Sequence, residues 1–176
     1  MSLTQYYTAT SLDGFIADER HSLDWLFTRD EDRAAPLSYD HFYERVGAVA
    51  MGATTYEWIL DHGGERWPYD VPARVFTHRE LRSVPGANVA FASGDVAPVH
   101  QELVEAAAGR NVWIVGGGEL AGQFADAGLL AEVIVYVAPV TLGLGAPLLP
   151  RRVELRLEET ARNGDFVTAR YAVVRS

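Results

Sequence analysis

Two segments of the chain run from a buried, apolar strand directly into glycine and then into a helix. These are residues 49–55 and 114–120, and a third strand, residues 74–76, ends in the polar residues 77–79. The N-terminus of a helix offers unpaired N–H groups and a partial positive charge, and glycine lets a ligand approach the backbone closely. In a parallel sheet these three strand ends share one edge, where open α/β sheets bind ligands. The pattern therefore predicts a site for a dinucleotide or another phosphorylated ligand.

The composition excludes several other kinds of chemistry. The chain has 176 residues with no cysteine and no lysine, so thiol catalysis, thiolate metal sites and Schiff bases are ruled out. Its net charge of −9 argues against nucleic-acid binding, and the five histidines lack metal-ligand spacing. No apolar run has the length of a membrane helix, and residues 1–5 contain no secretion signal. We therefore expect a cytoplasmic protein, without a metal site, whose bound cofactor carries the chemistry.

The elements that must position these segments alternate between strand and helix patterns. We expect strands at residues 3–10, 48–51, 73–76, 88–92, 112–115 and 133–140, and helices at residues 54–60, 98–108 and 120–128. Residues 22–35 have the polar composition of a loop, and Pro36 is suited to the first position of a helix. The G-x-G-x-x-G fingerprint is absent after the triple glycine, which disfavours a standard Rossmann fold.

The C-terminal part of the chain has a different pattern. Residues 153–157 and 167–173 alternate between apolar and polar side chains, with Asn163 and Gly164 between them. Alternation around Asn-Gly is the strongest short-range indication of a β-hairpin. We therefore predict a single α/β domain over residues 1–176. Its central sheet is mostly parallel and flanked by helices, with an antiparallel hairpin at the C-terminal end.

Five short motifs match a known family in their order and spacing. The chain carries SLDGFIA at 11–17, MGATTYE at 51–57, FTHR at 76–79, VGGGEL at 115–120 and APVTLG at 138–143. Together they resemble the dihydrofolate reductase-like superfamily, in particular small single-domain proteins related to the riboflavin-biosynthesis reductase domain. The resemblance covers nearly the whole chain and implies a nicotinamide cofactor and a homodimer.

The resemblance also implies roles for individual residues, most of them around the cofactor. The pyrophosphate would be held by Gly52, Thr54, Thr55, Gly116, Gly117, Gly118, Glu119 and Leu120. The adenosine 2′-phosphate would lie near Thr77, His78 and Arg79, and the nicotinamide carboxamide near Ala9 and Ile16. Trp25 matches an aromatic residue in a loop over the active site and would contact the substrate.

Two departures from the family pattern bear on specificity. Ala53 stands where the family usually has an arginine for the 2′-phosphate, and Glu119 stands where a basic residue is common. We therefore expect a modest preference for NADPH, with NADH as the alternative. Counting from Trp25 gives Asp30 as the carboxylate that meets the substrate. Three further acidic residues remain as alternatives, namely Asp24, Glu31 and Asp40.

The resulting hypothesis is an NADPH-dependent reductase of a small heterocycle, pterin-like or pyrimidine-like. One alternative is the 5-amino-6-(5-phosphoribosylamino)uracil reductase of riboflavin synthesis, and another is a dinucleotide-binding protein without turnover. Asp13, next to Gly14, has two interpretations that the sequence leaves open, because it fits either a local turn or a functional role. We expect a small-molecule substrate and neither a nucleic-acid nor a membrane partner.

Overall fold

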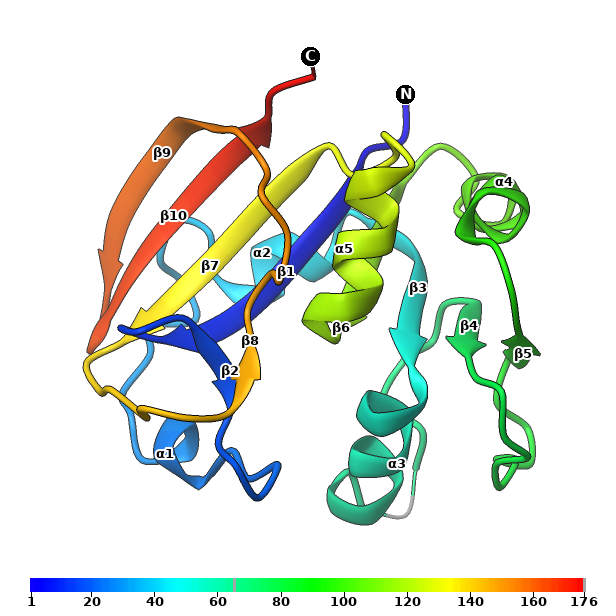
Figure 1. Cartoon of the computed structure of the whole chain (residues 1–176), viewed down its shortest axis with the longest axis horizontal. Coiled ribbons are helices and arrows are strands. Elements are labelled where there is room, and N and C mark those ends of the chain that lie inside the picture. Colours follow the sequence, from blue (N-terminus) through cyan, green and yellow to red (C-terminus); the bar gives the residue numbers. More distant parts are fainter. Residues whose placement is uncertain (65, 176) are drawn as a thin grey trace.

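The computed structural model describes residues 1–64 and 66–175, and its central feature is an eight-stranded sheet with the strand order β5-β4-β3-β6-β1-β7-β10-β9. The strands are β1 (Thr4–Ser11), β3 (Val46–Gly52), β4 (Ala73–Phe76), β5 (Val89–Ala92), β6 (Asn111–Gly116), β7 (Glu132–Ala138), β9 (Leu155–Asn163) and β10 (Phe166–Val173). All neighbouring pairs from β5 to β7 are parallel, whereas β10 is antiparallel to both β7 and β9. Figure 1 shows this hairpin at one edge of the sheet and β4 and β5 at the other. The predicted fold class is confirmed.

The sheet separates two apolar layers, because successive residues of each strand point to opposite faces. Tyr6 and Ile114 contribute to one layer, and their neighbours Tyr7 and Trp113 contribute to the other. The first layer is covered by α4 (Val96–Ala106) and α5 (Gly118–Asp126), and the second by α2 (Tyr39–Tyr43) and α3 (Ala53–His62). Strands buried on both faces explain the continuous apolar run in β6.

This arrangement creates a crevice between two neighbouring strands. Strands β3 and β6 pair in parallel, and each leads at its carboxyl end into a helix. The helix after β3 is α3 and the helix after β6 is α5, and these helices pack on opposite faces of the sheet. A point where successive connections diverge in this way is where open α/β sheets bind their ligands.

The predicted boundaries need correction in the N-terminal third of the chain. Residues 22–35 are not entirely a loop, because they contain the short helix α1 (Asp24–Phe27). Pro36 does not begin a helix, because Ser38 is the N-cap of α2 and its side chain accepts a hydrogen bond from the backbone of His41. A competing cap two residues later therefore outweighed the preference of proline for the first turn.

A second, two-stranded sheet was not predicted. It pairs β2 (Phe15–Ala17) with β8 (Ala146–Pro147) in antiparallel orientation. Both strands are too short to show an alternating pattern, and their pairing joins segments about 130 residues apart. Within the described ranges, no helix is long and apolar enough to cross a membrane.

Candidate functional site

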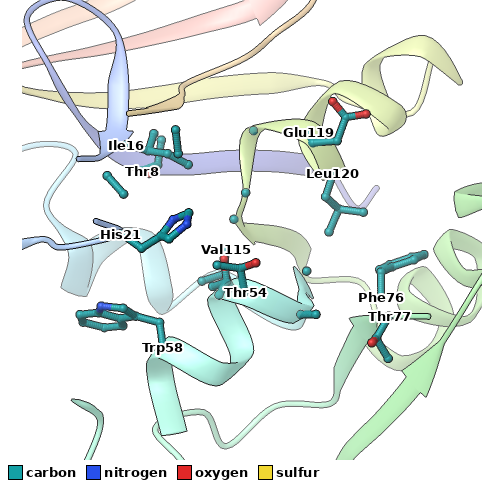
Figure 2. A pocket seen from close by; sticks show the side chains of 18 of the residues that line it. Thr8, Ile16, His21, Thr54, Trp58, Phe76, Thr77, Val115, Glu119 and Leu120 are labelled. Atoms are coloured by element: carbon teal, nitrogen blue, oxygen red, sulfur yellow. The ribbon is translucent and has the colours of Figure 1, made fainter. Parts of the chain in front are cut away.

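A cavity of about 760 Å³ opens at the carboxyl ends of β3, β4 and β6. It brings together most of the segments that the sequence singled out, although they are far apart along the chain. The residues predicted to contact a cofactor that line it are Ile16, Gly52, Thr54, Thr55, Thr77, His78, Gly116, Gly117, Gly118, Glu119 and Leu120. Figure 2 shows Thr8, Ile16 and His21 on one side of this space and Phe76 and Thr77 on the other.

The two helices that begin at this cavity lack side-chain caps. The N-cap residues are Gly52 for α3 and Gly117 for α5, and neither supplies a side-chain hydrogen bond. By contrast, α2 and α4 begin at Ser38 and Asp95, whose side chains accept hydrogen bonds from backbone N–H groups. The first N–H groups of α3 and α5 thus remain available, and their dipoles favour an anion in the cavity.

The glycines around the cavity fall into two classes. A Cβ added at Gly52 would meet no heavy atom within 4 Å, and one added at Gly117 would meet only Ile16, at 3.9 Å. A Cβ at Gly118 would instead overlap the backbone carbonyl groups of Pro147 and Leu148. Gly52 and Gly117 therefore leave room for a ligand, whereas Gly118 is required for packing α5 against β8.

The cavity wall beyond β4 has less positive charge than the sequence pattern indicated. Thr77 and His78 line the cavity, but Arg79 does not. The guanidinium of Arg79 forms a two-pronged ion pair with Glu57 of α3, with nitrogen–oxygen distances of 2.8 and 3.2 Å. The hydrogen bonds from Arg79 to this carboxylate raise the pKa of Arg79. A 2′-phosphate at this end would have to compete with Glu57 for the guanidinium.

Glu119 is neutralised by a neighbouring arginine. Its carboxylate accepts hydrogen bonds from the guanidinium of Arg151 at 2.6 and 3.1 Å, and Arg151 also pairs with Asp126 at 2.8 Å. The hydrogen bond from Arg151 lowers the pKa of Glu119, so the group stays charged but paired. In Figure 2 the carboxylate of Glu119 points away from Thr54 and His21, while Leu120 points inward. The repulsion that Glu119 would exert on a phosphate is reduced by this pairing.

A second cavity of about 400 Å³ lies next to the first. The two cavities share Thr8 and Val115, which lie on β1 and β6. Half of the residues that line the second cavity are aromatic, and the others include Arg29, Glu31 and Ala9. Ala9 was predicted to contact the nicotinamide but does not line the large cavity. The aromatic residues are Tyr7, Phe27, Tyr39, Trp113, Tyr136 and Phe166. Such a wall suits a flat ring, and the two charged side chains can orient it.

Two of the tyrosines in this wall remain neutral donors. Burial raises the pKa of both Tyr7 and Tyr136 above the usual value of a phenol. Both hydroxyl groups donate to the carbonyl of Leu37, at 3.4 and 2.8 Å. These bonds fix the two rings against the segment that precedes α2.

The turn of the C-terminal hairpin holds Glu31 at the second cavity. Asn163 is buried, accepts a hydrogen bond from the backbone N–H of Asp32 at 2.6 Å and donates to its carbonyl at 3.0 Å. The N–H of Asp165 donates to the carbonyl of Asp30, and the Asp165 carboxylate accepts from the N–H of Asp30, both at 2.9 Å. These bonds fix the backbone on both sides of Glu31, whose side chain lines the second cavity. Its carboxylate lies 3.9 Å from the guanidinium of Arg33.

The four acidic residues considered for substrate recognition are therefore placed differently. Glu31 lines the second cavity, whereas Asp30, Asp24 and Asp40 line neither cavity. Asp30 is exposed beside the hairpin turn. Of the four, Glu31 is thus the carboxylate that the structure places where it could bind a substrate, and Asp30 is not.

Trp25 is half-buried and lines neither cavity. Its indole N–H donates to the carbonyl of Ser22 at 3.1 Å, so it supports the loop that carries His21. His21 does line the large cavity, and sequence reasoning missed it because a lone histidine in a polar loop has no distinctive pattern. Thr8 and Trp58 were also missed, because a single residue within a strand or a helix gives no sign that it lines a cavity.

Asp13 has a structural role. Its carboxylate accepts hydrogen bonds from the Ser11 hydroxyl at 2.6 Å, from the N–H of Gly143 at 2.8 Å and from the N–H of Leu142 at 3.0 Å. These bonds, led by that from Ser11, lower the pKa of Asp13 to about 2. The carboxylate ties the loop before β2 to the loop before β8. The two strands that follow these loops contribute Ile16, Ala17, Ala146 and Pro147 to the wall of the large cavity.

The described residues contain no group of three or more histidine, aspartate or glutamate side chains placed to hold a metal ion. The charged or titratable groups of the two cavities include His21, His78, Arg29 and Glu31, together with Glu119, which is paired with Arg151. Beside them the cavities offer aromatic rings, hydroxyl groups and helix N-termini. This chemistry suits the binding of a phosphorylated dinucleotide beside a flat substrate, with the cofactor performing the redox step.

The family described as RibD C-terminal domain matches residues 4–165. The chain is 36% identical over 174 residues to the uncharacterized protein YwjB of Bacillus subtilis (strain 168), covering 96% of each sequence. A putative riboflavin biosynthesis protein from Shewanella sp. PV-4 has a similar structure, with a TM-score of 0.82, 26% identity, and coverage of 98% of this chain and 99% of that one.

Dihydrofolate reductase from Enterococcus faecalis, solved with NADP(H), shares the fold at a TM-score of 0.58. It is 15% identical, with 97% of this chain and 96% of that one covered. The resemblance inferred from the five motifs is confirmed.

Proposed function

Because the chain belongs to the RibD C-terminal domain family, we propose that it is an NADPH-dependent reductase of a small heterocyclic substrate, pterin-like or pyrimidine-like. The main support is the pair of adjoining cavities. One is bordered by two uncapped helix N-termini, and the other is lined by aromatic rings. A reductase of this kind needs such a pair, because the donor and the acceptor must meet while water is excluded.

The large cavity fits a dinucleotide in several respects. The N–H groups at the start of α3 and α5 would bind the pyrophosphate, with the hydroxyl groups of Thr54 and Thr55 beside them. Gly52 and Gly117 leave the space that this approach requires. The adenosine end would lie toward Thr77 and the nicotinamide end toward Thr8, because only the latter end joins the second cavity.

The second cavity would hold the substrate ring against Trp113, Tyr136 and Phe166. Glu31 would accept hydrogen bonds from ring N–H or amino groups, which pterins and aminopyrimidines both carry. Arg29, in the same wall, would accept an anionic substituent such as a phosphate. When bound, the dihydronicotinamide would supply a hydride ion to an electrophilic carbon of this ring.

Cofactor binding and turnover test this proposal separately. We expect calorimetric titration to give tighter binding of NADPH than of NADH. We also expect loss of NADPH absorbance with dihydrofolate or with 5-amino-6-(5-phosphoribosylamino)uracil. Turnover of the phosphoribosyl compound alone would favour the riboflavin-pathway reductase. Binding of NADPH without oxidation in the presence of either compound would favour a dinucleotide-binding protein, and absence of binding would refute the proposal.

The role of Arg79 in this preference can be measured directly. A hydrogen-bonded charge pair contributes roughly 1.5–3 kcal/mol, so Arg79→Ala should weaken NADPH binding by about tenfold or more and leave NADH binding unchanged. Glu57→Gln should strengthen NADPH binding, because it releases the guanidinium. Arg82→Ala is the matched control, since Arg82 is also exposed and also pairs with a carboxylate of α3, that of Asp61. Unlike Arg79, it does not directly follow the residues Thr77 and His78 that line the cavity. Equal losses for both cofactors would contradict this role.

A further inference from the structure

We propose that His21 donates the proton that completes the reduction, an inference that rests on the function proposed above. The residue lies in the loop between β2 and α1 and lines the large cavity. Figure 2 shows its ring facing the interior, with Thr8 and Ile16 on one side and Trp58 on the other. Thr8 also lines the second cavity, so His21 lies at the end of the cofactor cavity where the substrate begins.

The contacts of Trp58 place the same end of the cavity close to the substrate. Trp58 lines the large cavity, and its ring stacks with that of Phe27 at a centroid distance of 6.0 Å. Phe27 lines the second cavity. His21 is therefore next to two independent connections between the cavities, one through β1 and one through this aromatic pair.

The backbone holds His21 in a defined position although the residue is exposed. Its φ of +58° lies in the left-handed region, which is unfavourable for most residues that carry a Cβ. Asp18 stabilises this turn, because its carboxylate accepts from the N–H groups of Arg20 at 2.8 Å and Ser22 at 2.9 Å. The N–H of His21 donates to the carbonyl of Asp18 at 3.0 Å. These bonds fix the backbone of the loop at His21, whose imidazole lines the cavity.

The imidazole of His21 is also available for proton transfer. Within residues 1–64 and 66–175 its ring makes no hydrogen bond. By contrast, the rings of His41, His62 and His100 are hydrogen-bonded to Ser38, to the carbonyl of Trp58 and to Thr4, respectively. His78 lines the cavity beyond β4, next to Thr77 and away from the second cavity. Glu119 is paired with Arg151. Tyr69 also lines the large cavity and its ring contacts Trp113 of the second cavity, but burial raises the pKa of its phenol. Among the titratable side chains at the substrate end, His21 is therefore the one suited to give up a proton.

The step balances in atoms and electrons. Addition of hydride to the carbon of a C=N or C=O bond moves the π electrons onto the nitrogen or oxygen, which must then gain a proton. The N–H bond of the His21 imidazolium breaks, its proton forms the new N–H or O–H bond, and its electron pair stays on the ring. The imidazole then takes up one proton from the bulk solution before the next turnover, so that each cycle consumes one hydride from the cofactor and one proton from solution.

The test uses His21→Gly, because glycine adopts the left-handed conformation without strain and so preserves the loop. With NADPH and the compound that the native protein turns over, we expect kcat to fall about a hundredfold, with the Kd of NADPH unchanged. Free imidazole in the buffer should restore part of the rate. The control is Ala108→Gly, since Ala108 is also left-handed, with a φ of +51°, and lies at the end of α4 away from both cavities.

A second measurement does not depend on turnover. The imidazole resonances of His21 are those that disappear from the NMR spectrum of His21→Gly. In the native protein they should shift when dihydrofolate or 5-amino-6-(5-phosphoribosylamino)uracil is added to the NADP⁺ complex, while those of His41 should not.

Unchanged kcat in the variant, no rescue by imidazole, or resonances that do not respond would each overturn the role of His21. Absence of NADPH binding by the native protein would instead refute the proposed function, and the role of His21 with it.

Discussion

Hydrogen-bonding groups at the two ends of the central strands have different partners. At the amino ends, Gln5 donates to Glu132 at 2.6 Å, Asn111 donates to Gln5 at 3.0 Å and Arg170 donates to Glu132 at 3.0 Å. This chain of bonds crosses four neighbouring strands, from β6 to β10. At the carboxyl ends, within the described residues, the helices α3 and α5 begin at glycines without side-chain caps.

The difference separates stability from binding. Polar groups that are paired with one another stabilise the fold and have little left for a ligand. Helix N-termini that lack an internal partner keep their hydrogen-bonding capacity for a molecule that enters from solvent. We therefore expect substitutions at the amino ends to change the free energy of unfolding, and substitutions at the carboxyl ends to change ligand affinity.

Gly118 provides an exception that sharpens this comparison. It lies at the carboxyl end, but a Cβ there would overlap the carbonyl groups of Pro147 and Leu148. Gly118→Ala should therefore lower the free energy of unfolding by about 3 kcal/mol, the upper part of the range for overpacked sites. Urea denaturation followed by tryptophan fluorescence measures this loss. A variant as stable as the native protein would show that α5 and β8 are not packed as tightly as described.

At the amino ends, the largest effect is expected from Glu132→Ala. The substitution leaves Gln5 and Arg170 without their shared partner, so the free energy of unfolding should fall by about 2 kcal/mol. The Kd of NADPH should not change. Glu159→Ala is the matched control, because Glu159 is the more exposed partner of Arg170, and its loss should cost less than about 1 kcal/mol. A weaker NADPH complex in Glu132→Ala would break the comparison.

At the carboxyl ends, Gly52→Ala should change the affinity for the cofactor and leave the stability nearly unchanged. The added methyl group meets no heavy atom of the protein within 4 Å and projects into the space assigned to the pyrophosphate. We expect the Kd of NADPH to rise about tenfold, equivalent to about 1.4 kcal/mol, as measured by calorimetry. The free energy of unfolding should change by less than about 1 kcal/mol. An unchanged Kd would argue against a cofactor at the start of α3.

The smallest expected effect on stability is that of Asp13, a hydrogen-bonded carboxylate just beyond the carboxyl end of β1. Hydrogen bonds lower the pKa of Asp13 to about 2 from its usual 3.8, so the carboxylate stabilises the folded state at pH values above 3.8. This contribution should disappear as the pH falls from 3.8 toward 2. In thermal unfolding, the native protein should have a higher Tm than Asp13→Asn near neutral pH, and the difference should shrink over this interval. A difference that stays constant would contradict the assignment.

Much of the fold could be predicted because it depends on local patterns. The apolar run at 112–115, the helices after Gly52 and Gly117, and the alternation around Asn163 and Gly164 were each interpretable from the residues alone. The location of the large cavity followed from the same patterns, since parallel strands bring their carboxyl ends together. The start of α2 and the strands β2 and β8 were missed, because short elements depend on contacts with distant segments.

The details of the site depended on such contacts. Counting from Trp25 gave Asp30, with Glu31 among the alternatives. Glu31 lines the second cavity, and the side chain of Asn163, about 130 positions away, holds the adjacent Asp32. Arg79 follows a strand as the motif required, but Glu57 binds its guanidinium.

The sequence by itself determined most strands of the central sheet, the family and the edge of the sheet where the large cavity opens, because these depend on periodicity and on glycine at strand ends. The tertiary structure decided which side chains meet there, because the partners of a charged or polar side chain are set by packing between segments remote in the chain.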